Sequence, residues 1–169
     1  QFNEPWGLAV DKDGFVYVAD TWNHRIQKFD NDLRFMAKWG GFGEVPNGGD
    51  RNAGLFYGPR SIAIDAEGNL FITDTGNKRV QKFAPDGRSL GVYGTSGRDK
   101  GQFAEPVGIA IAPNGEFVVA DTWNRRVQRF DANFQYIGEF PVLGWAGNGL
   151  QNKPYIAVSP EGDILVTDP

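Results

Sequence analysis

The stretch VYVADTWNHRIQKF (Val16–Phe29) occurs three times in this chain with few changes. It returns as LFITDTGNKRVQKF (Leu70–Phe83) and as FVVADTWNRRVQRF (Phe117–Phe130), with no gap inside the motif. A fourth copy begins as ILVTDP (Ile164–Pro169). Successive aspartates of the motif are 54, 47 and 47 residues apart, and such a period indicates a repeat architecture.

A second shared block precedes each copy of the motif. It reads PWGLAVDKDG (Pro5–Gly14), PRSIAIDAEG (Pro59–Gly68), PVGIAIAPNG (Pro106–Gly115) and, one residue shorter, PYIAVSPEG (Pro154–Gly162). Each block combines a short apolar run with a turn sequence that ends in glycine, which tolerates the positive φ of hairpin turns. The block therefore predicts a first strand followed by a tight turn.

The repeat predicts four short strands, which we name a to d. Strand a is LAV, IAI or IAV, and strand b is the aromatic and β-branched run that ends at the aspartate. Strand c is RIQKF, RVQKF or RVQRF, which alternates with period two. Strand d is FMAKWG (Phe35–Gly40), SLGVYG (Ser89–Gly94) or FQYIGEF (Phe134–Phe140). One four-stranded sheet for each repeat of about 45 residues is typical of a β-propeller blade.

We therefore expect an all-β fold: a β-propeller of four-stranded antiparallel blades, with about three and a half blades present. Residues 1–169 form one propeller segment in this interpretation. The expected blades cover about residues 5–40, 58–94 and 105–140, with a partial fourth blade at about 153–169.

The combined pattern P-x-G-I-A-V-D-x-x-G-x-V-Y-V-A-D-T-x-N-x-R-I-Q-x-F resembles the NHL repeat over nearly the whole chain. The resemblance implies a closed propeller, commonly of six blades, so we expect this segment to be part of a six-bladed ring. The remaining blades then come from the same chain or from a partner chain. Tyr155 departs from the small residues Gly7, Ser61 and Gly108 at its position, which changes the expected shape of the central channel.

Two charged positions recur in every copy of the motif, as structural residues do. An aspartate at the end of strand b can accept backbone N–H bonds and hold the b–c turn. The arginine five residues later is expected to pair between blades or with loop carbonyls. These structural residues are Asp20, Asp74, Asp121 and Asp168, together with Arg25, Arg79 and Arg126.

One face of the fold is the candidate binding face. Because strands a to d alternate in direction, the b–c turns and the long d–a connections emerge together. Trp22 and Trp123 align with Gly76, and this variation suggests a ligand contact rather than a feature of every blade. Packing of these tryptophans against the adjacent long loop is the alternative, and His24 is expected to be a solvated polar residue. The candidate ligand-binding residues are Trp22, Asn23, His24, Arg60, Asn77, Lys78, Trp123, Asn124 and Arg125.

The composition excludes several kinds of chemistry. The chain has no cysteine, which removes thiolate metal sites and cysteine nucleophiles, and a single histidine. The turns DKDG and DAEG lack the remainder of a calcium loop. We therefore expect no catalytic residue, no metal and no cofactor. No apolar run is long enough to insert into a membrane.

The sequence favours a non-catalytic recognition scaffold for a protein or carbohydrate ligand. We expect one domain of a larger bacterial protein, located outside the cell or in the periplasm. The net charge of −4 does not favour nucleic acid as the ligand. Two alternatives stay open: a metal-dependent propeller enzyme of the lactonase or lyase type, and an RNA-binding NHL domain.

Overall fold

The computed structural model of this protein describes residues 1–145 and 154–167. These residues form three four-stranded antiparallel sheets, a two-stranded antiparallel sheet and a short parallel pair, with no α-helix among them. The expectation of an all-β fold of four-stranded antiparallel sheets is confirmed. The first sheet contains β1 (Pro5–Val10), β2 (Val16–Asp20), β3 (Arg25–Phe29) and β4 (Phe35–Gly40). The second contains β5 (Pro59–Ile64), β6 (Leu70–Asp74), β7 (Arg79–Phe83) and β8 (Ser89–Tyr93), and the third contains β11 (Pro106–Ile111), β12 (Phe117–Asp121), β13 (Arg126–Phe130) and β14 (Tyr136–Pro141). The fourth contains β15 (Ile156–Val158) and β16 (Ile164–Val166).

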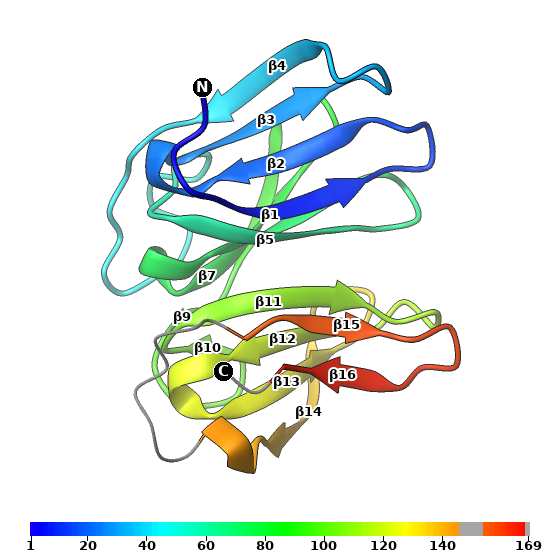
Figure 1. Cartoon of the computed structure of the whole chain (residues 1–169). Helices are drawn as coiled ribbons and strands as arrows, with labels where there is room; N and C mark the ends of the chain where they lie inside the picture. The colour runs from blue at the N-terminus through cyan, green and yellow to red at the C-terminus, as the bar shows by residue number, and fades with distance from the viewer. Residues whose placement is uncertain (146–153, 168–169) are drawn as a thin grey trace.

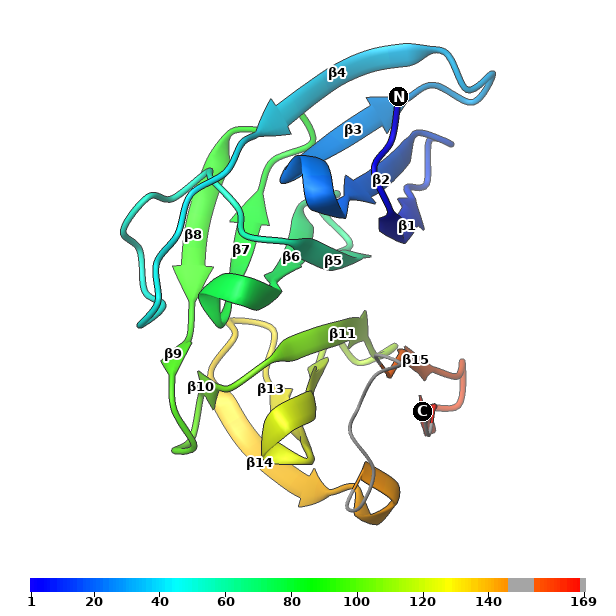
Figure 2. The same ribbon diagram turned by 60° about the vertical axis from the view of Figure 1, so that its left-hand side comes forward.

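Each sheet follows the order of the chain, so every strand pairs with the strand before and after it. The sheets stack side by side, and β1, β5, β11 and β15 lie along one side of the stack (Figure 1). The turned view places β4, β8 and β14 along the opposite side (Figure 2). The first strand of each repeat is therefore the innermost one, as in the blades of a propeller.

The hydrophobic core is divided into three clusters, one between each pair of neighbouring sheets. Middle strands such as β6 are buried along their whole length because both of their faces contact another sheet. This explains why the second strands read as continuous apolar runs rather than alternating ones. Representative members are Tyr17, Ile26, Leu70 and Phe83 in the first cluster, Phe71, Val80, Phe117 and Val119 in the second, and Val118, Val127 and Trp145 in the third.

Threonine side chains tie neighbouring sheets together. The hydroxyl of Thr21 donates to the carbonyl oxygen of Pro59 at 2.7 Å, and that of Thr75 donates to the carbonyl oxygen of Pro106 at 2.7 Å. Each bond runs from the b–c turn of one sheet to the first residue of the innermost strand of the next. Thr21 and Thr75 thus link the first three sheets, whereas the hydroxyl of the equivalent Thr122 has no partner within the described residues.

The last strand of the third sheet begins later than expected. Phe134 was assigned to this strand, but the strand starts at Tyr136. Phe134 lies in the preceding turn with φ of 60°, and its buried ring stacks on Phe130 at 4.5 Å and on Tyr93 at 4.6 Å. Leu33 and Gly87 occupy the same position of the turn with φ of 61° and 89°, and Leu33 is exposed, so the turn belongs to every repeat and does not depend on burial of the ring.

The long d–a connections are partly ordered by pairing between their own ends. The connection after β4 is closed by a parallel bridge between Phe42 and Phe56. The next connection contains a parallel pair, β9 (Thr95–Ser96) and β10 (Gln102–Phe103). Most of the third connection, residues 146–153, and the expected structural residue Asp168 lie outside the described residues.

Candidate functional site

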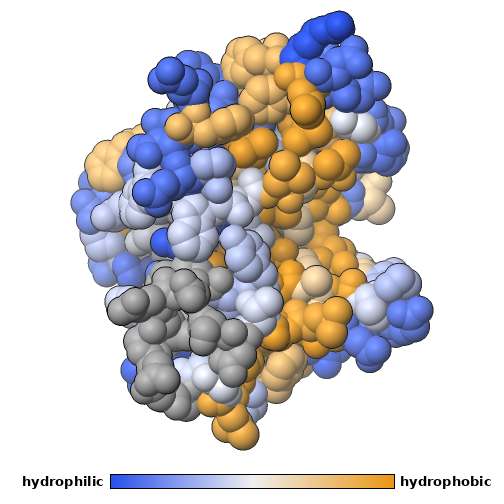
Figure 3. All heavy atoms as spheres, in the orientation of Figure 1, coloured by the Kyte–Doolittle hydropathy of each residue, from blue (hydrophilic) through white to orange (hydrophobic). Residues whose placement is uncertain are grey.

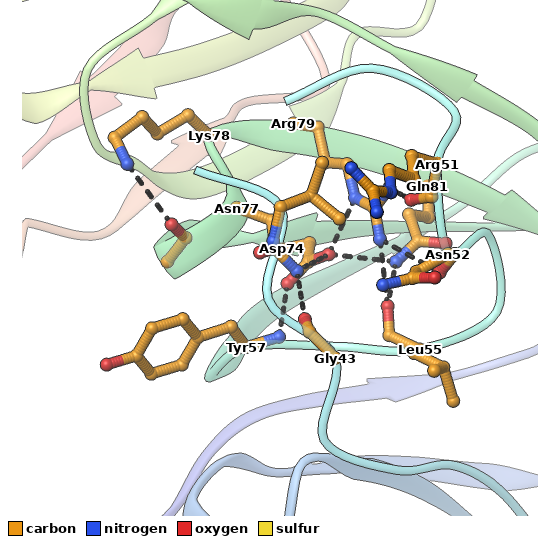
Figure 4. Close-up of polar contacts among 12 residues, drawn as sticks. Gly43, Arg51, Asn52, Leu55, Tyr57, Asp74, Asn77, Lys78, Arg79 and Gln81 are labelled. Atoms are coloured by element: carbon orange, nitrogen blue, oxygen red, sulfur yellow. Dashed lines mark hydrogen bonds and ion pairs between the residues drawn. The ribbon is translucent and has the colours of Figure 1, made fainter. Parts of the chain in front are cut away.

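The aspartate of each motif is the centre of a hydrogen-bonded hub at the b–c turn. Asp74 is fully buried and accepts four hydrogen bonds (Figure 4). Its donors are the backbone N–H of Tyr57 at 2.7 Å, the Asn77 amide at 2.8 Å, Nε of Arg79 at 2.8 Å and the Gln81 amide at 2.9 Å. A carboxylate with four donors has no free capacity for a ligand, so this residue is structural in the present geometry.

The other two hubs repeat the same four donors. In each, one N–H comes from the connection that precedes the repeat, and three come from the Asn, Arg and Gln of the motif. Asp20 accepts from the backbone N–H of Asn3 at 2.7 Å and from the side chains of Asn23 at 2.9 Å, Arg25 at 2.7 Å and Gln27 at 2.9 Å. Asp121 accepts from the backbone N–H of Ala104 at 2.9 Å and from the side chains of Asn124 at 2.8 Å, Arg126 at 2.9 Å and Gln128 at 3.2 Å.

The hub donors set the protonation state of Asp20. Burial alone raises the pKa of this carboxyl, but the N–H of Asn3 and the side chains of Asn23 and Arg25 outweigh that effect. The pKa of Asp20 therefore lies below its ordinary value, and the carboxylate is ionised at neutral pH. An ionised, saturated carboxylate does not serve as a proton donor.

The arginine of the second hub holds the connection in place. Arg79 is fully buried, and its Nη atoms donate to the carbonyl oxygens of Gly49 at 2.7 Å, Arg51 at 2.6 Å and Leu55 at 3.0 Å. Arg126 holds the next connection through carbonyl oxygens of Asp99 and Gln102. The motif arginines thus bind loop carbonyls, which was one of the two roles expected for them.

Among the asparagines of the motif, Asn77 requires a correction. Asn23, Asn77 and Asn124 are candidate ligand-binding residues, and each side-chain amide also donates to its hub aspartate. Asn77 is also fully buried and binds the loop from both ends, donating to the carbonyl oxygen of Gly43 and accepting from the N–H of Val45. Their recurrence at one position in every copy, like that of the aspartates, was the available signal of a structural role.

An aromatic ring lies over each b–c turn, but it does not come from the same position in every repeat. Trp22 and Trp123 are 41% and 63% exposed, and both lie in the turns themselves. At Gly76 an added Cβ would lie 2.6 Å from Cγ of Tyr57 and 2.7 Å from its carbonyl oxygen. The Tyr57 side chain therefore occupies the space that a larger residue at position 76 would need.

This exchange explains the variation noted in the sequence. Asn3, Tyr57 and Ala104 are equivalent, because each donates its N–H to the hub aspartate. Where this residue is small, the turn carries tryptophan, and where it is tyrosine, the turn carries glycine. The change from Trp22 to Gly76 thus has a packing reason, and one aromatic residue lies at the b–c turn of each of the three four-stranded sheets.

His24 was expected to be solvated, and the structure shows that it is not. It is half-buried, its Nδ1 accepts the N–H of Gly58 at 3.1 Å, and its ring contacts those of Phe42 at 5.1 Å and Tyr57 at 5.9 Å. Its equivalent Lys78 donates to the carbonyl oxygen of Pro46 at 3.2 Å. Both residues follow the turn in the left-handed conformation and hold the connection that lies above them.

The contact at His24 predicts a dependence of stability on pH. Burial lowers the pKa of His24 below its ordinary value of 6.5, and the charge of Asp74 opposes this only in part. Between these two pKa values the unfolded chain binds more protons, so stability is fully present above pH 6.5 and is lost as pH falls through the folded pKa. We expect the midpoint temperature of thermal unfolding to be lower at about pH 5.5 than at about pH 7.

The matched variant for this prediction is His24→Asn. Asparagine tolerates the left-handed conformation and does not titrate. Because His24 is the only histidine of the chain, the variant should flatten the pH profile in this window. Equal slopes for the variant and the parent in thermal melts would contradict the assignment.

A pocket of about 590 Å³ opens beside Trp123 on this face. Arg126 lies on its wall and is neutralised by Asp121 and Glu139 at 2.9 and 2.8 Å. Within the described part of the chain, the exposed side chains of Arg98 and Arg125 have no hydrogen bond or ion pair. The pocket is lined by Arg98, Trp123, Asn124, Arg125, Arg126, Glu139 and Pro141.

Arg60 lies apart from this pocket, at the start of the innermost strand β5, where its guanidinium carbon is 4.3 Å from the ring centre of Trp6. The remaining candidate residues Trp22, His24, Lys78, Trp123 and Arg125 lie on the face that carries the b–c turns. Across residues 1–145 and 154–167, no three His, Cys, Asp or Glu side chains gather into a metal-binding group. The same residues contain no helix that is long and apolar enough to cross a membrane.

The stacked four-stranded sheets with inner first strands define a β-propeller fold. The solved structure of a streptogramin B lyase superposes with a TM-score of 0.65 at 21% identity, over 97% of this chain and 48% of that chain. At this level of identity the likeness shows the fold alone.

The NHL repeat matches this chain at residues 2–29, 56–83 and 103–130, and the chain belongs to the NHL-repeat proteins. It is 40% identical over 74 residues to Protein brain tumor of Drosophila melanogaster, and 34% identical over 97 residues to NHL repeat-containing protein 3 of Mus musculus. These matches cover 44% and 55% of this chain, but only 7% and 26% of the two relatives. The repeat is therefore what the proteins share.

Proposed function

We propose that this chain is a non-catalytic scaffold that binds a protein ligand on the face formed by the b–c turns and the d–a connections. The pocket beside Trp123 carries the proposal. It places Arg98 and Arg125, whose side chains make no hydrogen bond or ion pair within the described residues, next to a largely exposed tryptophan. Tryptophan, tyrosine and arginine are the residues most enriched at energetically dominant positions of protein interfaces. The free arginines favour an acidic segment of the partner.

The same face offers little for catalysis. The aspartates at the turns are saturated by four donors each, and the only histidine uses Nδ1 to hold a loop. A lyase-like or metal-dependent enzyme is the alternative class, and the likeness to a lyase is a likeness of fold. Stoichiometric calcium or zinc in the purified protein would favour that alternative.

The proposal includes a ring larger than the described sheets. We expect six blades, of which about three and a half lie in this chain, with the others from the same protein or a partner chain. Apolar side chains remain exposed on the first and the last sheet, and Figure 3 shows apolar atoms gathered along the side where the inner strands lie. Further blades would cover these surfaces, which rarely stay exposed in monomers. The residues concerned include Leu8 and Val10 on β1, Tyr155 before β15, and Leu165 on β16.

Selection from a random peptide library tests the proposed ligand class. We expect acidic peptides with apolar anchors to be enriched on the parent protein. Trp123→Ala and Arg125→Ala should each weaken the best peptide about thirtyfold, the effect of losing a dominant interface residue. Isothermal titration calorimetry of the parent and of each variant with that peptide measures the change in affinity.

The control is Arg34→Ala, because Arg34 lies in an exposed pair with Asp32 in a turn of the opposite face. This variant should bind the peptide as the parent does. Peptides that bind all variants equally would contradict the site. If the protein binds glycans or single-stranded RNA and binds no peptide, the ligand is a glycan or an RNA and the proposed protein ligand is wrong.

A further inference from the structure

A second cluster of side chains lies at the inner strands, separate from the pocket beside Trp123. The β1–β2 ladder is irregular between Pro5 and Gly7, and the β5–β6 ladder is irregular between Pro59 and Ile62. The β11–β12 ladder is irregular at the equivalent place, between Pro106 and Ile109, so the irregularity belongs to every four-stranded sheet and re-aims the side chains that follow the proline. The residues that leave the ladders at these points include Trp6 and Arg60, whose side chains stack on one another.

Arg60 differs from the other buried and half-buried arginines of the described chain, because no hydrogen bond or ion pair compensates its charge. Arg79 is buried and makes five hydrogen bonds, whereas the guanidinium of half-buried Arg60 makes no hydrogen bond or ion pair with any residue in 1–145 or 154–167. Its Nη1 is buried and without an acceptor. Buried charges are normally paired, since desolvation without a partner is costly.

The groups that face Arg60 narrow the kind of partner it accepts. Burial lowers its pKa, while Glu105, Tyr155 and Glu4 act in the opposite direction. Both glutamates are close enough to act on the charge of Arg60. Two neighbouring carboxylates disfavour a doubly charged anion such as phosphate, and the remaining match for a planar guanidinium is a singly charged carboxylate.

We propose that Arg60 and Trp6 form an axial binding site for a carboxylate, with Tyr155 as its opposite wall. The guanidinium binds both oxygens of the carboxylate, and the Trp6 ring supports the guanidinium from one side. The Tyr155 hydroxyl donates to the carbonyl oxygen of Trp6 at 3.5 Å, so Tyr155 reaches from the fourth sheet to the first. Position 155 thus places a large side chain beside Trp6, where the equivalent residues Gly7, Ser61 and Gly108 are small.

Carboxylate titrations followed by NMR of the Arg60 Nε–H and the Trp6 indole test this site. The probes are sodium acetate, N-acetyl-glycylglycine with a free carboxylate, its C-terminal amide, and an amidated peptide with one internal glutamate. We expect the three carboxylates to shift both signals and the amide to shift neither. A stronger response to the free C-terminus, to the glutamate or to acetate identifies the source of the carboxylate.

The decisive variants change the guanidinium alone. Arg60→Met should weaken carboxylate binding at least about tenfold, and Arg60→Lys should lie between it and the parent, because lysine keeps the charge without the planar fork. Arg34→Met, on the opposite face, should bind as the parent does. Unchanged binding by Arg60→Met, or no shift with any carboxylate, would overturn the proposal.

A thermal melt separates this role from a purely structural one. Because Arg60→Met removes a charge that lacks a partner, its melting temperature should equal or exceed that of the parent. A fall of about 5 °C or more would mean that Arg60 stabilises the fold, and would overturn the proposal. The same variant should still bind the acidic peptide at the pocket beside Trp123. The proposal for Arg60 and the proposal for the pocket can therefore be contradicted independently.

Discussion

Asp74→Ala should lower the free energy of unfolding by about 4 kcal/mol, the cost of removing one partner from a buried ion pair. The substitution leaves the fully buried Arg79 without Asp74, which lies 2.8 Å away and is its one anionic partner within residues 1–145 and 154–167. It also leaves the amides of Asn77 and Gln81 and the N–H of Tyr57 without this acceptor. Small domains are stable by about 5–15 kcal/mol, so the variant should be close to unfolding.

The matched variant is Asp20→Ala, which removes the same four acceptor contacts in the first hub. The Arg25 side chain is 23% exposed, whereas that of Arg79 is not exposed at all. Water can solvate Arg25 after the substitution, so we expect a loss of only about 2 kcal/mol. Urea unfolding of both variants gives the comparison, and equal losses would show that burial of the arginine does not control the effect.

Gly76→Trp should destabilise the protein by about 3 kcal/mol, as severe overpacking does. Its Cβ would overlap with Tyr57, where the nearest side-chain atom lies 2.6 Å away. The first repeat shows how the clash is avoided, because Trp22 coexists there with the smaller Asn3. Combination with Tyr57→Asn removes the clash with the ring, so it should restore part of the lost stability, while the carbonyl oxygen 2.7 Å from the added Cβ stays in place.

A double-mutant cycle in urea measures this exchange. Tyr57→Asn alone should destabilise, because the ring contacts of Tyr57 with His24 and Phe42 are lost. The loss of unfolding free energy in the double variant should be about 2 kcal/mol smaller than the sum of the losses in the two single variants, which is within the range found for residues in contact. Additive effects would mean that the two positions do not share space.

The repeat register made most of the fold predictable. Four copies of one pattern fixed the strands, the turns and the face on which turns and connections meet, because residues at equal positions have equal surroundings. The start of β14 was missed because an apolar residue, Phe134, occupies the positive-φ turn position that holds Gly87 in the second repeat, and its ring packs on Tyr93 of the neighbouring sheet. Such contacts between repeats are not visible within one copy of the motif.

The candidate site was harder to predict for the same reason. Variation between Trp22 and Gly76 suggested a ligand contact, but its cause is Tyr57, which lies in a connection outside the shared motif. His24 was placed in solvent because its aligned residues are charged, and Phe42 and Tyr57 of the longer connection cover it instead. The lack of a partner at Arg60 depends on atoms from several inner strands and leaves no mark in the sequence.

Each hub aspartate binds an N–H of the connection that comes before its own repeat. The piece of chain that completes a hub is therefore offset from the repeat that the alignment defines. For the second sheet, that piece includes Gly43, Gly49 and Tyr57, all of which precede Pro59. Recombination of NHL units between proteins should accordingly use breakpoints at the end of the fourth strand, so that each transplanted unit brings the loop that its own turn recognises.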